Sequence, residues 1–281
     1  MAESPTTEPR AVRVALIATA MLLMGALVVL PLVMVLAAAF GEGFATWWAA
    51  LNTPDARAAL ELTLVTAAIV IPLNAVFGVL TAWAVTRFEF PGKRALLALI
   101  DLPFAVSPVV AGLCLVLLFG REGWFAPLLQ AWDIRILFAR PGIVLATLFI
   151  TFPFVARELI PLMQQQGADE ELAARSLGAG AWQMFRRVTL PNIRWGLLYG
   201  VLLCGARAMG EFGAVSVVSG HIRGLTNTLP LHIEILYNEF DTTAAFAVAS
   251  LLAGLALVTL VLKFWLETRH GDALARNAAR H

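Results

Sequence analysis

The sequence predicts an all-α membrane protein that crosses the bilayer six times. Of its 281 residues, 60% are hydrophobic and only 14% are charged, and the mean hydropathy is +0.81. A soluble domain carries about 25% charged residues. The chain instead holds six apolar runs of the length that crosses a hydrocarbon layer, about 20 residues. Its Lys and Arg residues are also shared unequally between the segments that join these runs. Together these observations indicate a polytopic membrane protein.

The six apolar runs define the predicted spans in chain order. They are Val14–Ala39, Leu60–Val85, Leu96–Phe119, Gly142–Met163, Trp195–Val218 and Ala244–Leu266. The first run, of about 26 residues, exceeds the apolar region of a signal peptide, and no convincing cleavage site follows it. We therefore expect a tail at 1–13, a retained peripheral helix at 14–39, a five-helix core at 60–266 and a tail at 267–281.

The distribution of Lys and Arg predicts that both termini are cytoplasmic. With an even number of spans, the segments on that side hold thirteen Lys and Arg residues, against five outside. Positive residues are enriched in cytoplasmic loops. The external ones are Arg57, Arg121, Arg135, Arg140 and Arg223, while Arg157 and Arg207 fall inside the apolar runs.

Several motifs are missing, and their absence narrows the function. The sequence holds no G-x-x-x-x-G-K-[ST] phosphate loop, no H-E-x-x-H and no G-x-S-x-G. ATP hydrolysis on this chain and intramembrane catalysis are therefore not expected. Cys114 and Cys204 lie in apolar runs without metal-ligand companions, and we expect both to be buried free thiols.

A charged segment, "DEELAARSLGAGAWQMFRRVTLP" at residues 169–191, separates two apolar runs. It predicts a short helix with Asp169 as N-cap, a reversal at Gly178 and Gly180, and a second helix that Pro191 ends. Trp182, Phe185 and Val188 share a stripe of that second helix. The spacing alone leaves two interpretations open: a knob that fits a groove on another protein, or a loop lying on the membrane surface.

This segment resembles the coupling loop of type-I ABC importer permeases. The shared pattern is E-A-A, a glycine four residues on, and I-x-L-P some ten residues later. One departure is that Leu172 stands at the usual glutamate position, with Glu171 one residue earlier. A shift of one residue turns a helical side chain by about 100°. The resemblance implies that an ATPase is contacted by Glu171, Ala173, Ala174, Gly178, Phe185, Val188, Leu190 and Pro191.

Four longer stretches extend the resemblance over residues 60–266. They are similar to the W-type permease of sulfate/thiosulfate importers: "TRFEFPGKRALLALIDLPFAVSPVVAG" from Thr86, "TFPFVARELIPLM" from Thr151, "LGAGAWQMFRRVTLPNIRWGLLYG" from Leu177 and "ARAMGEFGAVSVVSGHIRG" from Ala206. The resemblance implies a type-I ABC importer permease fold in the bacterial inner membrane. It also implies a heterodimer with a T-type permease, two copies of an ATPase subunit and a periplasmic sulfate/thiosulfate-binding protein.

The same resemblance implies that this chain is a permease and not an enzyme. ATP and Mg are expected on the partner ATPase, and no cofactor or metal is expected here. Membrane lipid surrounds the chain, and no nucleic-acid partner is implied.

The predicted fifth span carries the candidates for the translocation path. Arg207 and Glu211 are four residues apart and share a helix face, and charges within a span usually face an interior or a cavity. Glycines at this point allow close backbone approach or an unwound turn, and serines supply hydroxyl donors. The full set is Arg207, Gly210, Glu211, Gly213, Ser216 and Ser219. The alternatives are a purely structural salt bridge and serines that bond their own helix.

Three further features have ambiguous roles. Arg157 is interpreted as an anchor whose side chain extends toward headgroups, and Asp101, before Pro103 and Pro108, as part of an irregular entry segment. The external segment 221–242 is either a docking surface or a solvated connector.

Two other functions remain as alternatives. One is a molybdate or tungstate permease of the same superfamily. The other is a self-sufficient secondary anion transporter, which would be expected to show an inverted repeat. The sequence does not decide between sulfate and thiosulfate, nor between a homodimer and a heterodimer.

Overall fold

The structure, a computed structural model, describes residues 9–278, and every element assigned in that range is helical. The predicted tails lie partly outside it, at residues 1–8 and 279–281. The elements are α1 (Arg10–Phe40), α2 (Phe44–Leu51), α3 (Pro54–Arg87), α4 (Lys93–Ala105), α5 (Pro108–Phe119), α6 (Ala126–Ala131), α7 (Arg140–Gln166), α8 (Asp169–Ser176), α9 (Ala181–Met184), the π-helix η1 (Phe185–Thr189), α10 (Leu190–Met209), α11 (Gly213–Ser219), α12 (Leu229–Asn238) and α13 (Thr242–Ala278).

Four helices of the described range are long and apolar enough to cross a membrane unbroken: α1, α3, α7 and α13. Two further crossings are bent pairs, α4 with α5 at 113° and α10 with α11 at 51°. Counting each pair as one span gives the predicted six. The fifth span is broken where its glycines were expected to allow an unwound turn, and the third span bends just before Pro108. Proline and glycine interrupt the helical hydrogen bonds at each bend.

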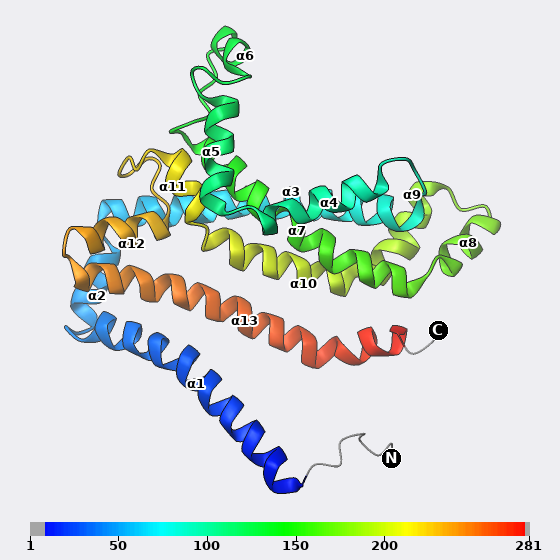
Figure 1. Cartoon of the computed structure of the whole chain (residues 1–281), viewed down its shortest axis with the longest axis horizontal. Helices are drawn as coiled ribbons and strands as arrows, with labels where there is room; N and C mark the ends of the chain where they lie inside the picture. The colour runs from blue at the N-terminus through cyan, green and yellow to red at the C-terminus, as the bar shows by residue number, and fades with distance from the viewer. Residues whose placement is uncertain (1–8, 279–281) are drawn as a thin grey trace.

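The long helices run alongside one another, with the loop 169–191 at one end and α2 and α12 at the other (Figure 1). The core forms where α7 packs between α3 and α10, and α13 packs on α10. The helix α1 meets α13 and is largely exposed within the described chain, and its peripheral place in the membrane stays a prediction. The helices α5 and α6 project from the side of this bundle (Figure 1).

Small residues set the close approach of α10 to α7. A Cβ added at Gly196 would lie 2.4 Å from Leu162 Cδ2, and one at Gly200 would lie 3.1 Å from Val155 Cα. This G-x-x-x-G pair therefore serves helix packing, which brings backbones close enough for extensive van der Waals contact.

Two smaller expectations are corrected by the fold. Cys204 is buried as predicted, but Cys114 on α5 is exposed. Asp101 lies in the regular helix α4 rather than in an irregular segment, since the bend comes later, at Val106–Ser107. Pro103 is tolerated within α4.

Candidate translocation and coupling sites

The loop 169–191, called the knob below, consists of α8, a tight turn and the start of a long helix. Gly178 ends α8 with φ of +87°, a left-handed conformation that residues with a Cβ rarely adopt. The helix N-cap is Ala168 rather than the predicted Asp169, which occupies the first turn. Pro191 does not end the second helix, which runs on from Ala181 to Met209. Pro191 has no backbone N–H to donate, and the wider π-helical turn η1 just before it accommodates this missing donor.

Glu171 faces into the protein and fixes the knob to the bundle. Arg87 Nε, at the end of α3, donates to Glu171 Oε2 at 2.6 Å, and Thr189 Oγ1 donates to Oε1 at 2.7 Å. The same guanidinium donates to the carbonyl of Met163 on α7 at 3.1 Å. One carboxylate therefore joins α3, α8 and η1. The Glu171 side chain thus points inward, toward α3 and η1.

The outer face of the knob is apolar with a basic border. Leu172 is 59% exposed, Leu177 87% and Trp182 72%. Arg175 and Arg186 are exposed beside them. This face lacks a cover in the described chain.

The predicted contact residues divide between the two faces of the knob. Ala173, Gly178 and Pro191 are exposed, and Ala174, Phe185, Val188 and Leu190 are half-buried. Phe185 stacks on Trp182 and packs at a tilt against Trp83. Their contact with an ATPase stays a prediction.

The break in the fifth span lies at Gly210–Phe212, and Glu211 organises it. Its side chain is 1% exposed. Oε1 accepts from the backbone N–H of Ala214 at 2.9 Å, at the start of α11, and Oε2 lies 2.6 Å from Arg207 Nη1. The carboxylate thereby compensates for backbone bonds lost at the bend and holds an arginine that keeps 33% of its side chain exposed.

The other candidates near the break make local contacts. Ser216 Oγ donates to the carbonyl of Gly213 at 2.9 Å, and the buried Ser219 Oγ accepts from the N–H of His221 at 3.2 Å. Gly210 forms the C-cap of α10. Both hydroxyls thus have partners within their own segment. A role for these residues along the path stays a prediction.

The two broken spans meet one another. A Cβ added at Gly213 would lie 2.8 Å from Pro108 Cβ, and one at Gly112 would lie 2.9 Å from the carbonyl of Ala214. The bend between α4 and α5 therefore lies against the bend between α10 and α11. Irregular backbone at membrane depth is found where protein or a water-filled cavity surrounds it.

Sequence reasoning missed a buried polar contact at the centre of the bundle. Asn74 Nδ2 on α3 donates to Thr151 Oγ1 on α7 at 2.7 Å and lies 3.4 Å from Cys204 Sγ on α10. All three side chains are fully buried. An asparagine within an apolar run could have predicted this contact, because a buried amide side chain needs hydrogen-bond partners on neighbouring helices.

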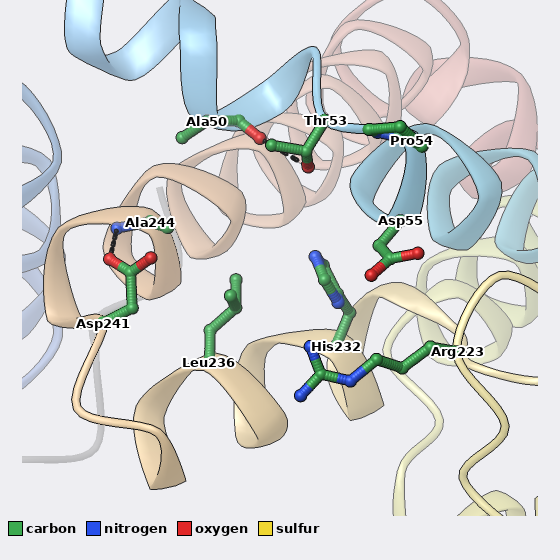
Figure 2. A pocket seen from close by; sticks show the side chains of 9 residues that line it. All are labelled: Ala50, Thr53, Pro54, Asp55, Arg223, His232, Leu236, Asp241 and Ala244. Atoms are coloured by element: carbon green, nitrogen blue, oxygen red, sulfur yellow. Dashed lines mark hydrogen bonds between the residues drawn. The ribbon is translucent and has the colours of Figure 1, made fainter.

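At the opposite end from the knob, a cavity of about 210 Å³ lies between α2, α3, α12 and α13 (Figure 2). His232 and Asp55 turn toward this space, with Arg223 and Asp241 at its border. His232 is 3% exposed, and its Nδ1 makes no hydrogen bond with any described residue. Burial lowers the pKa of His232 below its usual 6.5, against the opposing effect of Asp55.

Among the residues whose side chains the structure describes, no three or more His, Cys, Asp or Glu are arranged to hold a metal ion.

Comparison with known proteins identifies the family. The model of the binding-protein-dependent transport system inner membrane component family matches residues 74–271. The chain belongs to this family. It is 53% identical to the sulfate transport system permease protein CysW of Synechocystis sp., over 92% of this chain and 94% of that protein. It is 38% identical to the sulfate transport system permease protein CysT of Escherichia coli K12, over 90% of this chain and 91% of that protein.

A solved structure confirms the predicted permease fold. The crystal structure of a bacterial alginate ABC transporter, in complex with an alginate pentasaccharide-bound periplasmic protein, contains a chain with a TM-score of 0.72 and 16% identity. The match covers 94% of this chain and 97% of that one. The family also confirms that the chain is a multi-pass inner membrane transport component.

Proposed function

We propose that this chain is the W-type transmembrane subunit of an ATP-driven sulfate importer. It pairs with a T-type permease, receives the anion from a periplasmic binding protein, and is driven by a separate ATPase that binds ATP and Mg. The sulfate permeases CysW and CysT, at 53% and 38% identity, support the substrate class and the pairing of two different permeases. The excess of Lys and Arg supports cytoplasmic termini.

One observation carries the mechanism. A single helix begins in the knob at Ala181 and ends at Met209. It ends beside the break, where Glu211 pairs with Arg207. At 1.5 Å per residue, these 29 residues span about 43 Å. The exposed end of this helix bears Trp182, and the other end bears Arg207.

Movement of the knob is therefore transmitted along the helix to the break. The Glu171–Arg87 contact fixes the other half of the knob to α3 and α7, so both α3 and α10 follow the ATPase. At the break, the exposed part of the Arg207 guanidinium presents donors to a tetrahedral oxyanion, a ligand that arginine recognises through two parallel hydrogen bonds. Glu211 keeps that arginine in place.

The apolar outer face of the knob supports docking to a protein over contact with headgroups. In Figure 1 α8 lies beyond the ends of α3 and α4, at the far end of the long helices. Exposed Leu177 and Trp182, bordered by arginines, suit a groove in a partner.

The experiment that tests the function is sulfate uptake by the reconstituted complex. The chain is assembled with its T-type permease, ATPase and binding protein in liposomes, and radioactive sulfate uptake is measured with and without ATP. We expect uptake only with ATP and binding protein. Uptake by this chain alone without ATP would contradict the proposal and favour a secondary transporter.

Unlabelled thiosulfate and molybdate, added as competitors, then define the substrate. Competition by thiosulfate is expected. Stronger competition by molybdate than by sulfate itself would assign the chain to the molybdate branch instead.

A further inference from the structure

An Arg–Asp pair joins α4 and α7 in the half of the bundle nearest the knob. Arg157 Nε lies 3.4 Å from Asp101 Oδ1, and the Arg157 Cζ lies 4.9 Å from the centre of the Phe104 ring. Asp101 is eight residues along α4 from Lys93, or about 12 Å. Arg157 is six residues from Met163, whose carbonyl binds Arg87, or about 9 Å. Both side chains thus lie well along their helices from the end that carries the knob.

The anchor interpretation expected the Arg157 guanidinium to extend toward the headgroups, but it does not. It lies over Phe104, which is farther along α4 from the cytoplasmic end than Asp101 is. Phe104 in turn packs edge-on against Phe154 of α7. The aromatic pair therefore holds the cation at this depth.

The described chain leaves this pair largely uncovered. The Arg157 side chain is 55% exposed and the Asp101 side chain 59%. Placing a charge in hydrocarbon is costly, so charged side chains in a span face protein or water. The uncovered side of the pair therefore faces the interior of the assembled transporter rather than lipid.

The pair is looser than the other two Arg–carboxylate pairs inside the bundle. The N–O separation is 2.6 Å in both Arg87–Glu171 and Arg207–Glu211, and the carboxylate of each pair is nearly buried. The 3.4 Å separation of Arg157 and Asp101 exceeds the range of about 2.7–2.9 Å for a charge-assisted hydrogen bond. An arginine held this loosely can exchange its carboxylate for another anion.

Its position relative to Arg207 suits a second stop for the same anion. Because Gly200 of α10 contacts Val155 of the antiparallel α7, the two arginines can be placed along one axis. Arg157 lies two residues beyond Val155 toward the knob end of α7. Arg207 lies seven residues beyond Gly200 toward the opposite end of α10. The separation along the axis is about 13 Å.

We propose that Arg157 is a binding station for a tetrahedral oxyanion in the inner half of the path, with Asp101 as the counter-ion that the passing anion displaces. This inference rests on the proposed function. The guanidinium presents parallel N–H donors to two oxygens of the anion, and Asp101 takes the arginine back when the anion leaves. Neither charge is thus left without a partner in the path.

The direct test is chemical labelling of a cysteine at position 101. In the assembled transporter, with Cys114→Ser as background and buried Cys204 left in place, Asp101→Cys is exposed to an anionic methanethiosulfonate in water. We expect labelling, slowed about fivefold by sulfate at four times its dissociation constant. Leu99→Cys, 60% exposed on the same helix, is the matched control, whose labelling sulfate does not slow. Failure of Asp101→Cys to react, or reaction at a rate that sulfate does not change, would overturn the proposal.

Uptake kinetics provide the second measurement. We expect Arg157→Gln to lower sulfate uptake at least about tenfold per assembled complex, the loss of a charge-assisted contact. We expect Asp101→Asn to lower the KM for sulfate, because no carboxylate then competes with the anion for the Arg157 guanidinium. A purely structural ion pair predicts instead equal losses of assembled complex for both variants. If the wild-type complex takes up sulfate but these results fail, the station alone is wrong; if the wild type takes up none, the proposed function itself is wrong.

Discussion

The arginine–carboxylate pairs Arg87–Glu171 and Arg207–Glu211 have the same 2.6 Å separation but differ in exposure. In the knob, both side chains are nearly enclosed, Arg87 at 12% and Glu171 at 11%. At the helix break, Glu211 is 1% exposed while Arg207 keeps 33%. In the first pair Thr189 also donates to Glu171, and Arg87 also donates to the Met163 carbonyl. The second buries its acid and leaves its base accessible.

This difference separates a structural clamp from a site. A nearly enclosed pair stabilises one arrangement of α3, α8 and η1 and leaves little access for another anion. A half-open pair keeps a cation at membrane depth, available to a ligand, and neutral overall when no ligand is bound. The predictions below follow from that contrast.

The largest effect is expected from removal of the clamp. Glu171→Ala leaves Arg87 unpaired in a nearly buried position, a change that costs about 3–5 kcal/mol. We expect hydrogen exchange of amides 169–180 to rise strongly and transport to be lost while the spans stay inserted. Glu170→Ala, which removes only the exposed contact with Asn192, is the control. Equal exchange in Glu171→Ala and wild type would show that the pair does not hold the knob.

The next effect concerns the open pair. Arg207→Ala is expected to lower sulfate uptake about 10- to 100-fold, the equivalent of a lost charged hydrogen bond of about 1.5–3 kcal/mol. In Arg207→Ala the Glu211 carboxylate is left as an unpaired buried charge. The double variant Arg207→Ala with Glu211→Gln removes that charge, and the amide oxygen introduced at position 211 still accepts from the N–H of Ala214. This variant should recover assembly but not uptake. Parallel recovery of both would make the pair structural.

A smaller effect distinguishes two glycines of the knob. Gly178 has φ of +87°, whereas Gly180 is extended with φ of −68°, and an added Cβ meets no atom at either position. Gly178→Ala therefore costs about 1–2 kcal/mol through backbone strain alone. We expect uptake per ATP hydrolysed to fall in Gly178→Ala and to be retained in Gly180→Ala. Identical ratios in the two variants would mean that the shape of this turn does not set coupling.

The smallest effect is a pH dependence at the far end of the bundle. Burial lowers the folded-state pKa of His232 below 6.5; Asp55 and Glu239 oppose this, and Arg223 adds to it. As the pH falls through about 6.5, the unfolded chain takes up a proton that the folded chain does not, so stability decreases toward acid. His232→Gln should reduce the fall in apparent melting temperature between about pH 7.5 and pH 5.5. An unchanged fall would exclude His232 as its source.

The sequence predicted the number and order of the spans because apolar length is a local property. It indicated irregular backbone near both bends, through Pro103 and Pro108 in the third run and Gly210 in the fifth, but it fixed neither the residues of the breaks nor the bend angles. Proline alone is not decisive: Pro72, Pro153 and Pro161 lie inside unbroken helices. Which of these residues bend the chain depends on the tertiary contact between the two breaks.

The candidate sites were predicted unevenly for a related reason. The Arg207–Glu211 pair followed from helical spacing alone. The inward direction of Glu171 did not, because its partners Arg87 and Thr189 lie on other elements. The knob also reverses the usual pattern: its carboxylate is buried while Leu177 is 87% exposed. Such a face is expected where a partner protein supplies the cover.

The central claim, that the knob drives the break through one continuous helix, is tested most directly by hydrogen exchange at residues 208–214 of the assembled transporter. Exchange is compared with and without ATP and vanadate, in the wild type and in Gly178→Asp. We predict that nucleotide changes exchange at the break in the wild type and leaves it unchanged in the variant, although the ATPase binds nucleotide in both. The same change in both proteins, or none in the wild type, would contradict the account.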